Sequence, residues 1–215
     1  MNYKVLYRKY RPKTFDEIVG QNNIITLLKD SIINNKISHA YIFSGPRGTG
    51  KTSTAKIFAK AINCLDNIDG NPCLNCEICS NFNLNNDIYE IDAASNTGVD
   101  QIREIIDNVK LSPITSKYKV YIIDEVHMLS TSAFNALLLT LEEPPSHVVF
   151  ILATTNIEDV PITVLSRCQR LDFRKIANKD IHEQLKKVSN EENIDISDEA
   201  IEEITNYSDG GMRDA

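Results

Sequence analysis

The feature that most constrains this chain is a run of eight residues that is rich in glycine and ends in lysine and threonine. The run is Gly45-Pro46-Arg47-Gly48-Thr49-Gly50-Lys51-Thr52. Glycine readily adopts the conformations that turn backbone N–H groups inward, lysine supplies a cation, and a hydroxyl can ligate Mg²⁺. An apolar segment precedes the run and an Ala- and Ile-rich stretch follows it. This context disfavours a chance match and predicts a phosphate-binding loop (P-loop) for a nucleoside triphosphate such as ATP.

We expect each end of this run to have a separate role in binding the nucleotide. A helix that starts at Lys51 would direct the positive end of its dipole at the phosphates. Lys51 itself would contact the β- and γ-phosphates, and the Thr52 hydroxyl would ligate Mg²⁺. The three glycines would form the cradle around the phosphates.

Two acidic residues follow the apolar segment 120–123 directly, namely Asp124 and Glu125. A buried strand that ends in this way places the first carboxylate near the metal and the second near the attacking water. We therefore expect Asp124 to hold Mg²⁺ and Glu125 to be the general base of a hydrolysis. Two solvated carboxylates at a strand end are the alternative, which the P-loop upstream disfavours. A hydroxyl at the end of the apolar run 148–153 could touch the γ-phosphate or the water.

Short apolar runs alternate with amphipathic stretches along most of the chain, which is typical of an α/β domain with a mostly parallel sheet. Strands are expected at 40–44, 88–92, 120–124, 148–153 and 170–173. Helices are expected at 21–35, 51–62, 99–109, 131–142, 178–191 and 197–208. Since no strand follows Phe173, we place a nucleotide-binding domain at 1–175 and the first part of a helical lid domain at 176–215. Residues 211–215 resemble another helix start, so we expect a truncated lid.

The composition is that of an ordinary soluble globular protein, with 42% hydrophobic and 25% charged residues. The formal charge of −7 disfavours a basic footprint for nucleic acid over the whole surface. The N-terminus lacks the apolar run of a signal peptide, and the runs at 120–123 and 148–153 are too short to span a bilayer. We therefore expect a cytoplasmic protein without a membrane partner.

Four of the five cysteines are spaced as C-x8-C-x2-C-x2-C, at Cys64, Cys73, Cys76 and Cys79. Closely spaced thiolates form chelating turns, and four of them favour Zn²⁺ over harder cations. We expect a zinc module at about 64–82, with an iron–sulfur cluster or a redox dithiol as alternatives. Cys168 stands apart and is expected to be a small core residue.

Further strings accompany these motifs along the chain. They include Ser166-Arg167-Cys168, Gly211-Met212-Arg213-Asp214-Ala215, the opening segment at 7–15, and Asp124-Glu125-Val126-His127-Met128-Leu129-Ser130. Together they resemble the bacterial clamp-loader ATPases of the AAA+ class, from residue 1 to residue 215. The resemblance implies an AAA+ P-loop NTPase fold with a parallel sheet flanked by helices, a small zinc module and the start of a helical lid domain. Zinc is also what the resemblance implies for the four cysteines.

The resemblance also implies roles for five residues outside the P-loop. Thr155 would sense the γ-phosphate, and Arg213 would contact the nucleotide from the lid. Arg167 would be an arginine finger that acts in trans on the ATP of a neighbouring subunit; from the residues alone, a surface salt bridge is the alternative. Tyr7 and Arg11 would belong to the nucleotide-binding set.

At the level of function, the resemblance implies an ATPase motor subunit that loads the sliding clamp on primed DNA within the DNA polymerase III holoenzyme. Its partners would be the other subunits of a hetero-oligomeric ring, the sliding clamp, primer–template DNA, and the replicative polymerase and helicase through further C-terminal regions. The segment 95–98 could hold a DNA phosphate at the start of the helix expected at 99–109. Leu139 stands where the family often has lysine, so DNA affinity is expected only in the assembled ring.

Two other functions remain open from the residues. One is a zinc-bearing interaction module that binds nucleotide only as a conformational ligand, which Glu125 disfavours. The other is a different AAA+ motor acting on DNA, such as a branch-migration motor, which the cysteine cluster and the string His127-Met128-Leu129-Ser130 disfavour.

Overall fold

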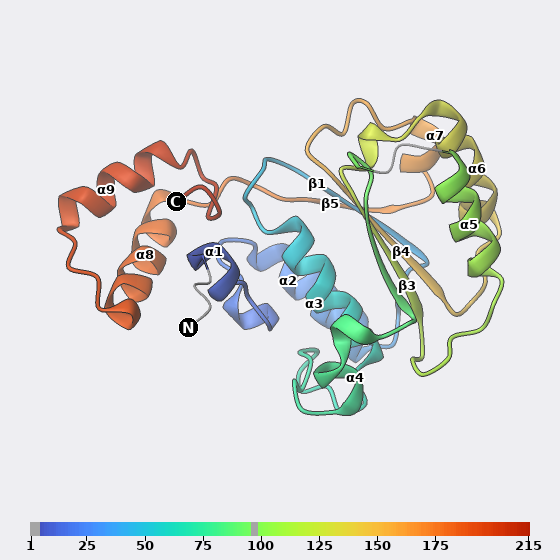
Figure 1. Ribbon diagram of the computed structural model, residues 1–215, viewed down its shortest axis with the longest axis horizontal. Coiled ribbons are helices and arrows are strands. Elements are labelled where there is room, and N and C mark those ends of the chain that lie inside the picture. Colours follow the sequence, from blue (N-terminus) through green and yellow to red (C-terminus); the bar gives the residue numbers. More distant parts are fainter. Residues whose placement is uncertain (1–4, 96–98) are drawn as a thin grey trace.

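The computed structural model describes residues 5–95 and 99–215, and its centre is a five-stranded parallel sheet (Figure 1). The strand order is β2-β3-β4-β1-β5. The strands are β1 (Ala40–Ser44), β2 (Ile88–Asp92), β3 (Lys119–Asp124), β4 (Val148–Thr154) and β5 (Gln169–Asp172). All five expected strands are confirmed, each within one residue at either end.

The register brings the carboxyl ends of the strands to one edge of the sheet. Ser44 at the end of β1 pairs with Thr154 on β4 and with Asp172 on β5, and Asp92 at the end of β2 pairs with Asp124 on β3. Ligands of open parallel sheets bind outside this edge. The P-loop starts there, directly after β1.

Helices cover both faces of the sheet, so the strands are apolar on both sides. Tyr41 and Phe43 of β1 pack on the face that carries α2 (Asn22–Ile33) and α3 (Lys51–Asn63). Side chains of the alternate residues pack on the opposite face, which carries α5 (Val99–Val109), α6 (Thr131–Glu142) and the short α7 (Ile162–Leu165) (Figure 1). These two apolar layers hold the edge that bears the P-loop.

The six expected helices are confirmed, with bounds shifted by at most two residues; the last two are α8 (Asn178–Glu192) and α9 (Asp198–Tyr207). The Ser130 and Ser197 side chains cap α6 and α9 by accepting the N–H groups of Ala133 and Ala200 at 3.3 and 3.2 Å. Residues 212–214 form a turn in which the Asp214 and Ala215 N–H groups donate to the Gly211 carbonyl at 3.1 and 3.2 Å, so the helix start expected at 211–215 stays a prediction.

Several short elements were not expected, since three or four residues carry no readable periodicity. They are α1 (Leu6–Lys9), α4 (Glu77–Ser80), α7, and the 3₁₀ turns η1 (Phe15–Glu17), η2 (Phe82–Leu84) and η3 (Val126–Met128). Residues of α1 and η1 line the candidate site described below, and η3 carries a histidine beside it.

Helices α8 and α9 pack on each other to one side of the sheet, next to α1 (Figure 1). Glu192 at the end of α8 accepts the Tyr10 hydroxyl and pairs with Lys9. The buried Gln21 side chain donates to the Arg174 carbonyl at 2.7 Å and accepts the Arg174 N–H at 3.2 Å. These contacts fix the helical pair beside the P-loop. Within the described residues, no helix has both the length and the apolar character needed to cross a membrane.

Candidate nucleotide-binding site

The P-loop leaves β1 and enters α3 at Lys51, as the sequence indicates. Gly48 and Gly50 have φ of 77° and 97°, a region that strains residues with a side chain. A Cβ on Gly45, where φ is 141°, would lie 2.3 Å from the Phe173 carbonyl oxygen. The loop therefore needs glycine for its curvature at two positions, and at Gly45 also for its close approach to the chain that follows β5.

Lys51 is buried inside this loop, with 6% of its surface exposed. Its ammonium group donates to the carbonyl oxygens of Gly45 at 2.7 Å and Pro46 at 2.8 Å. Burial lowers the pKa of Lys51, and the negative charges of Glu125 and Asp124 oppose that shift. The cation is thus held between the P-loop and the two acidic residues at the end of β3.

Thr52 and Asp124 form a pair of hard oxygen ligands at the foot of the loop. The Thr52 hydroxyl donates to Asp124 Oδ2 at 2.7 Å. Mg²⁺ prefers oxygen ligands, and in nucleotide sites the protein supplies one or two of them while phosphates and waters supply the rest. The pair therefore fits Mg²⁺ at the position that the sequence indicates.

Glu125 and Thr155, both expected to be catalytic, are in direct contact. Glu125 Oε2 accepts the Thr155 hydroxyl at 2.9 Å and the Thr155 N–H at 3.3 Å. Glu125 has φ of 49°, an uncommon value for a residue with a side chain, and such conformations cluster at functional sites. His127 was not singled out in the sequence, and its Nδ1 lies 3.5 Å from the same carboxylate oxygen.

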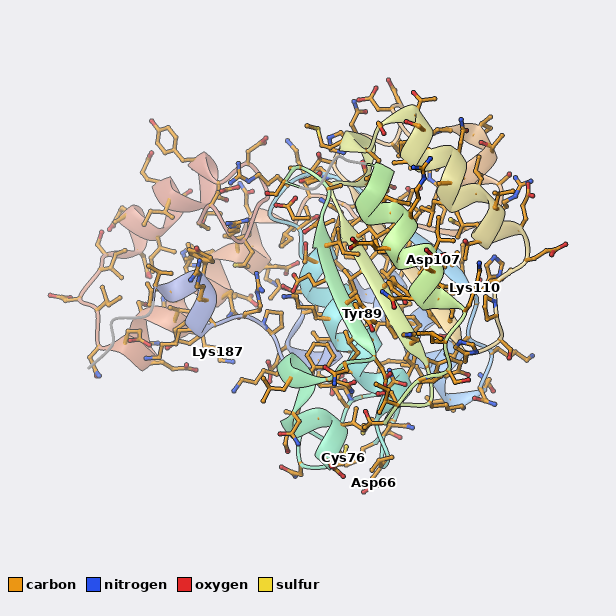
Figure 2. The ribbon with its side chains drawn as sticks, turned by 45° about the vertical axis from the view of Figure 1, so that its right-hand side comes forward. Asp66, Cys76, Tyr89, Asp107, Lys110 and Lys187 are labelled. Atoms are coloured by element: carbon orange, nitrogen blue, oxygen red, sulfur yellow. The ribbon has the colours of Figure 1, made fainter. Side chains whose placement is uncertain are left out.

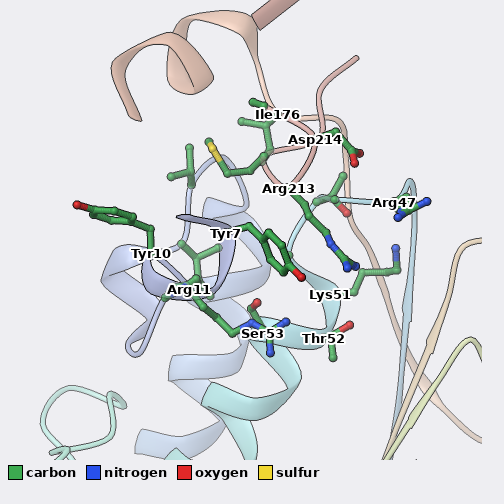
Figure 3. A pocket seen from close by; sticks show the side chains of 18 of the residues that line it. Tyr7, Tyr10, Arg11, Arg47, Lys51, Thr52, Ser53, Ile176, Arg213 and Asp214 are labelled. Carbon is green, nitrogen blue, oxygen red and sulfur yellow. The ribbon is translucent and has the colours of Figure 1, made fainter. Parts of the chain in front are cut away.

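These groups line one cavity of about 500 Å³, which also receives residues from both ends of the chain. Tyr7, Arg11 and Arg213 line it, and the Arg213 guanidinium lies 5.1 Å from the centre of the Tyr7 ring. Both side chains point toward the P-loop in Figure 3. The structure thus brings together the P-loop residues 47–52 with the expected acidic and terminal residues. Gly45, Pro46 and Arg167 do not line the cavity.

Residues from α8 also line this cavity, although no motif in the sequence indicates them. They are Gln184, Leu185 and Val188. Their spacing of three and four residues places them on one helix face, a signal that was available in the sequence. Apolar Ile18, Val19, Ile176 and Met212 extend the lining, which suits the flat ring of a nucleotide base.

Arg167 lies in a different hollow, lined by His39, Leu141, Glu142 and Ser166. Its guanidinium donates to Glu142 Oε1 at 2.6 Å and to the Thr163 carbonyl at 2.7 Å. The surface salt bridge considered from the sequence is therefore present. Arg167 does not line the cavity of its own P-loop.

The four clustered cysteines meet at one point beside α4, and Cys64 comes directly after α3. Their ligand atoms all lie within 4.8 Å of one another, and three of the Sγ–Sγ distances are 3.6, 3.9 and 3.9 Å. A tetrahedral Zn²⁺ with Zn–S bonds of about 2.3 Å needs Sγ–Sγ distances of about 3.8 Å. The cluster therefore has the donor set and the size for zinc.

The thiols of this cluster differ in acidity. Burial raises the pKa values of Cys79 and Cys64. At Cys76, burial is outweighed by hydrogen bonds from the Leu65 and Cys79 backbone and from neighbouring thiols, which lower its pKa to about 6. Figure 2 shows Cys76 at the tip of the molecule, away from the helices α8 and α9. The fifth cysteine, Cys168, was expected in the core; it is half-buried and packs against the layer of α5, α6 and α7.

Two features bear on the expected contact with DNA, the segment 95–98 and Leu139. Of the segment 95–98, residues 96–98 are outside the described part of the chain. Leu139 is on α6 with 72% of its surface exposed, so it does not serve the core.

Comparison with known sequences places these features in one family. Residues 20–177 match the family described as "DNA polymerase III, delta subunit". The whole chain is 52% identical to DNA polymerase III subunit tau of Bacillus subtilis and covers 38% of that protein. It is 47% identical to subunit tau/gamma of Haemophilus influenzae and 46% identical to subunit tau of Escherichia coli, covering 32% and 34% of them. The chain thus spans about a third of the length of these relatives.

Among solved structures, the fold is similar to that of the Thermotoga maritima RuvB Holliday junction branch migration motor. The TM-score is 0.69 at 24% identity, over 95% of this chain and 62% of RuvB. A gamma subunit-related protein of DNA polymerase III from the same organism has a TM-score of 0.58 at 23% identity, over 75% and 49% of the two chains. At these identities the likeness supports the AAA+ P-loop fold, which confirms the expected fold class.

Proposed function

The chain belongs to the DNA polymerase III delta-subunit family and aligns over its whole length with tau and gamma subunits, and from this premise we propose that it is the ATPase motor of a bacterial clamp loader. In this proposal it couples ATP binding and hydrolysis to the loading of the sliding clamp on primed DNA. The observation that carries the proposal is the single cavity at which the P-loop, the Thr52–Asp124 pair and the Glu125–Thr155 pair meet.

The proposed chemistry divides the work among these groups. The P-loop N–H groups and Lys51 bind the β- and γ-phosphates, while Thr52 and Asp124 hold Mg²⁺. When bound, the metal neutralises part of the phosphate charge. Glu125 accepts a proton from the attacking water through the carboxylate oxygen that Thr155 does not hold.

We further assign the residues at the chain ends to nucleotide recognition. Arg213, Tyr7 and Arg11 contact the nucleotide from two sides, and the chain divides into a nucleotide-binding domain at 1–175 and the first part of a lid domain at 176–215. Nucleotide binding between these parts would set the angle of the lid, which is how ATP would alter the shape of a ring.

Arg167 completes the site of a neighbouring subunit in this proposal. A guanidinium gives planar, bidentate contact to the charge that develops on the transferred phosphoryl group. The position of Arg167 outside its own nucleotide cavity supports this assignment. The partners are accordingly other subunits of a hetero-oligomeric ring, the sliding clamp, primer–template DNA, and the polymerase and helicase, all in the cytoplasm. The four cysteines hold a structural Zn²⁺ away from the reaction.

The test is ATP turnover by the full-length protein reconstituted with its loader partners, clamp and primed DNA. We expect strong stimulation by clamp plus DNA, and a Glu125→Gln variant that binds ATP with unchanged affinity but turns it over at least about 100-fold more slowly. If clamp and primed DNA leave turnover unchanged, the clamp-loader function is wrong. Undiminished turnover by the variant would contradict the assignment of the general base.

A further inference from the structure

His127 lies behind the carboxylate of Glu125 and contacts the end of β4. It is on the 3₁₀ turn η3, and 15% of its side chain is exposed. Its Nδ1 is 3.0 Å from the Thr154 hydroxyl oxygen and 3.5 Å from Glu125 Oε2. The contacts from Thr155 end on the same Oε2. His127 and Thr155 therefore both lie next to the same carboxylate oxygen of Glu125.

The hydrogen bonds of Thr154 bear on which atom is the donor in its contact with His127. The Thr154 hydroxyl donates its single proton to the Asn156 carbonyl at 2.9 Å, and its oxygen accepts the Asn156 N–H at 3.0 Å. A hydroxyl has one donor and two acceptor sites, so the remaining site of Thr154 can only accept. With the hydroxyl proton on the Asn156 carbonyl, the matching tautomer of His127 carries its proton on Nδ1 and donates it to Thr154.

The same proton is the nearest further donor for Glu125. At 3.5 Å the contact with Oε2 is longer than a strong hydrogen bond, so the proton points mainly at Thr154. The backbone on either side is fixed, because the Met128 N–H donates to the Glu125 carbonyl at 2.9 Å and Thr154 is fully buried. A small rotation of the imidazole or of the carboxylate is enough to bring Nδ1–H onto Oε2.

We propose that His127 is a positioning residue for Glu125, an inference that rests on the proposed ATPase function. When the Thr155 hydroxyl turns to the γ-phosphate, Oε2 loses its shortest hydrogen bond. Nδ1–H of His127 then takes over as the donor to Oε2 and keeps the carboxylate in place. The other oxygen, Oε1, stays directed at the attacking water. Without this donor, only the longer hydrogen bond from the Thr155 N–H, at 3.3 Å, would hold Oε2 during the step in which the orientation of Glu125 matters most.

The charged groups around Glu125 make such a donor necessary. Lys51 attracts the carboxylate toward the P-loop, whereas the neighbouring Asp124 repels it. Neither interaction fixes the direction of the carboxylate plane, because both are forces between charges without strict geometry. A hydrogen bond from an imidazole that is itself held by Thr154 supplies that direction.

The test compares two variants of His127 in the full-length protein assembled with its loader partners, clamp and primed DNA. His127→Leu keeps a side chain of moderate size but has no donor, whereas His127→Asn places an amide N–H near the position of Nδ1. We expect His127→Leu to lower kcat by about tenfold or more, with KM and the Kd of a fluorescent ATP analogue within about twofold of the unmutated protein. His127→Asn should recover most of kcat.

Two results would overturn the proposal. The first is an unchanged kcat in His127→Leu. The second is a parallel loss of kcat, nucleotide affinity and thermal stability in both variants, which is the signature of a purely structural role. His147→Leu is the control, because His147 precedes β4 at the end opposite Thr154; its kcat should stay within about twofold.

The Glu125→Gln variant separates this inference from the proposed function. If it abolishes stimulated turnover while His127→Leu does not lower kcat, only the role of His127 is wrong. If the unmutated assembly shows no stimulated turnover, both are wrong.

Discussion

The Thr52 hydroxyl donates to Asp124 Oδ2 at 2.7 Å, although 72 residues separate them in the chain. The pair exists because β1 and β3 end at the same edge of the sheet, with β4 between them. Each motif is readable separately in the sequence, and the parallel sheet is what makes them one site.

Asp124→Asn should raise the Mg²⁺ concentration needed for half-maximal ATP turnover by roughly 10–100-fold, because it removes a negative charge beside the metal. A Mg²⁺ titration of turnover in the assembled protein measures the shift. Asp107→Asn is the matched control on the exposed side of α5, where the carboxylate is 80% exposed. Equal Mg²⁺ requirements in the Asp124→Asn variant and the unmutated protein would exclude Asp124 from the metal site.

Gly45→Ala should destabilise the protein by about 3 kcal/mol or more, since the new Cβ would lie 2.3 Å from the Phe173 carbonyl oxygen. Gly50→Ala has the same change in composition, but its nearest contact would be at 4.0 Å, so only backbone strain of about 1–2 kcal/mol is expected. Urea unfolding of both variants measures the difference. A Gly50→Ala variant that is the less stable of the two would be inconsistent with this packing.

Asp87→Asn should lower the free energy of unfolding at neutral pH by about 2–3 kcal/mol. The buried Asp87 carboxylate accepts the N–H groups of Ile114, Thr115 and Ser116 at 2.7–2.8 Å. Burial raises its pKa, but these hydrogen bonds outweigh burial and lower it below the usual value.

The sign of the pH dependence follows from that lowered pKa. The stabilisation by Asp87 is fully present above the unfolded-state pKa of about 4 and is lost as the pH falls through the lower folded-state value. The difference in unfolding free energy between the unmutated protein and Asp87→Asn should therefore shrink below about pH 4. Asp107→Asn, tested in parallel, should show almost no difference at any pH. A difference that grows on acidification would contradict the assignment.

Removal of zinc by a chelator should lower the melting temperature and release one Zn²⁺ per chain, since a small cysteine module gains much of its folding free energy from the metal. Elemental analysis of the untreated protein gives the metal directly. Cys76→Ser should reduce the zinc content strongly, whereas Cys168→Ser should leave it at one per chain. Iron in place of zinc, or equal zinc in both variants, would show that the four-cysteine assignment is wrong.

Motif chemistry and periodicity predicted most of the fold and many of the site residues. The five strands and six longer helices have repeating apolar patterns, and the P-loop, Asp124 and the cysteines have diagnostic spacings. The residues that were missed act through tertiary contacts. Gln21 joins the P-loop side to Arg174, and the residues of α8 reach the cavity because the chain folds back after β5.

Other features depend on geometry that no spacing in the sequence encodes. The contact of His127 with Thr154 follows from the turn after Glu125, whose backbone adopts a left-handed conformation. The ion pair between Arg167 and Glu142 joins α6 to the segment that follows α7. Helix α7 itself was not expected from the sequence. Such contacts between distant segments become visible only once the strands are ordered in the sheet.

The central claim is that this chain carries a hydrolytic site that a neighbouring subunit completes with Arg167. The most direct measurement is ATP turnover by Arg167→Ala in the assembled ring with clamp and primed DNA, alongside the Kd for ATP. We predict a loss of stimulated turnover of roughly 10³-fold or more with ATP affinity within about twofold, and no loss in Arg170→Ala, an arginine that pairs with Asp172 on β5. Full stimulated turnover by Arg167→Ala would contradict the claim.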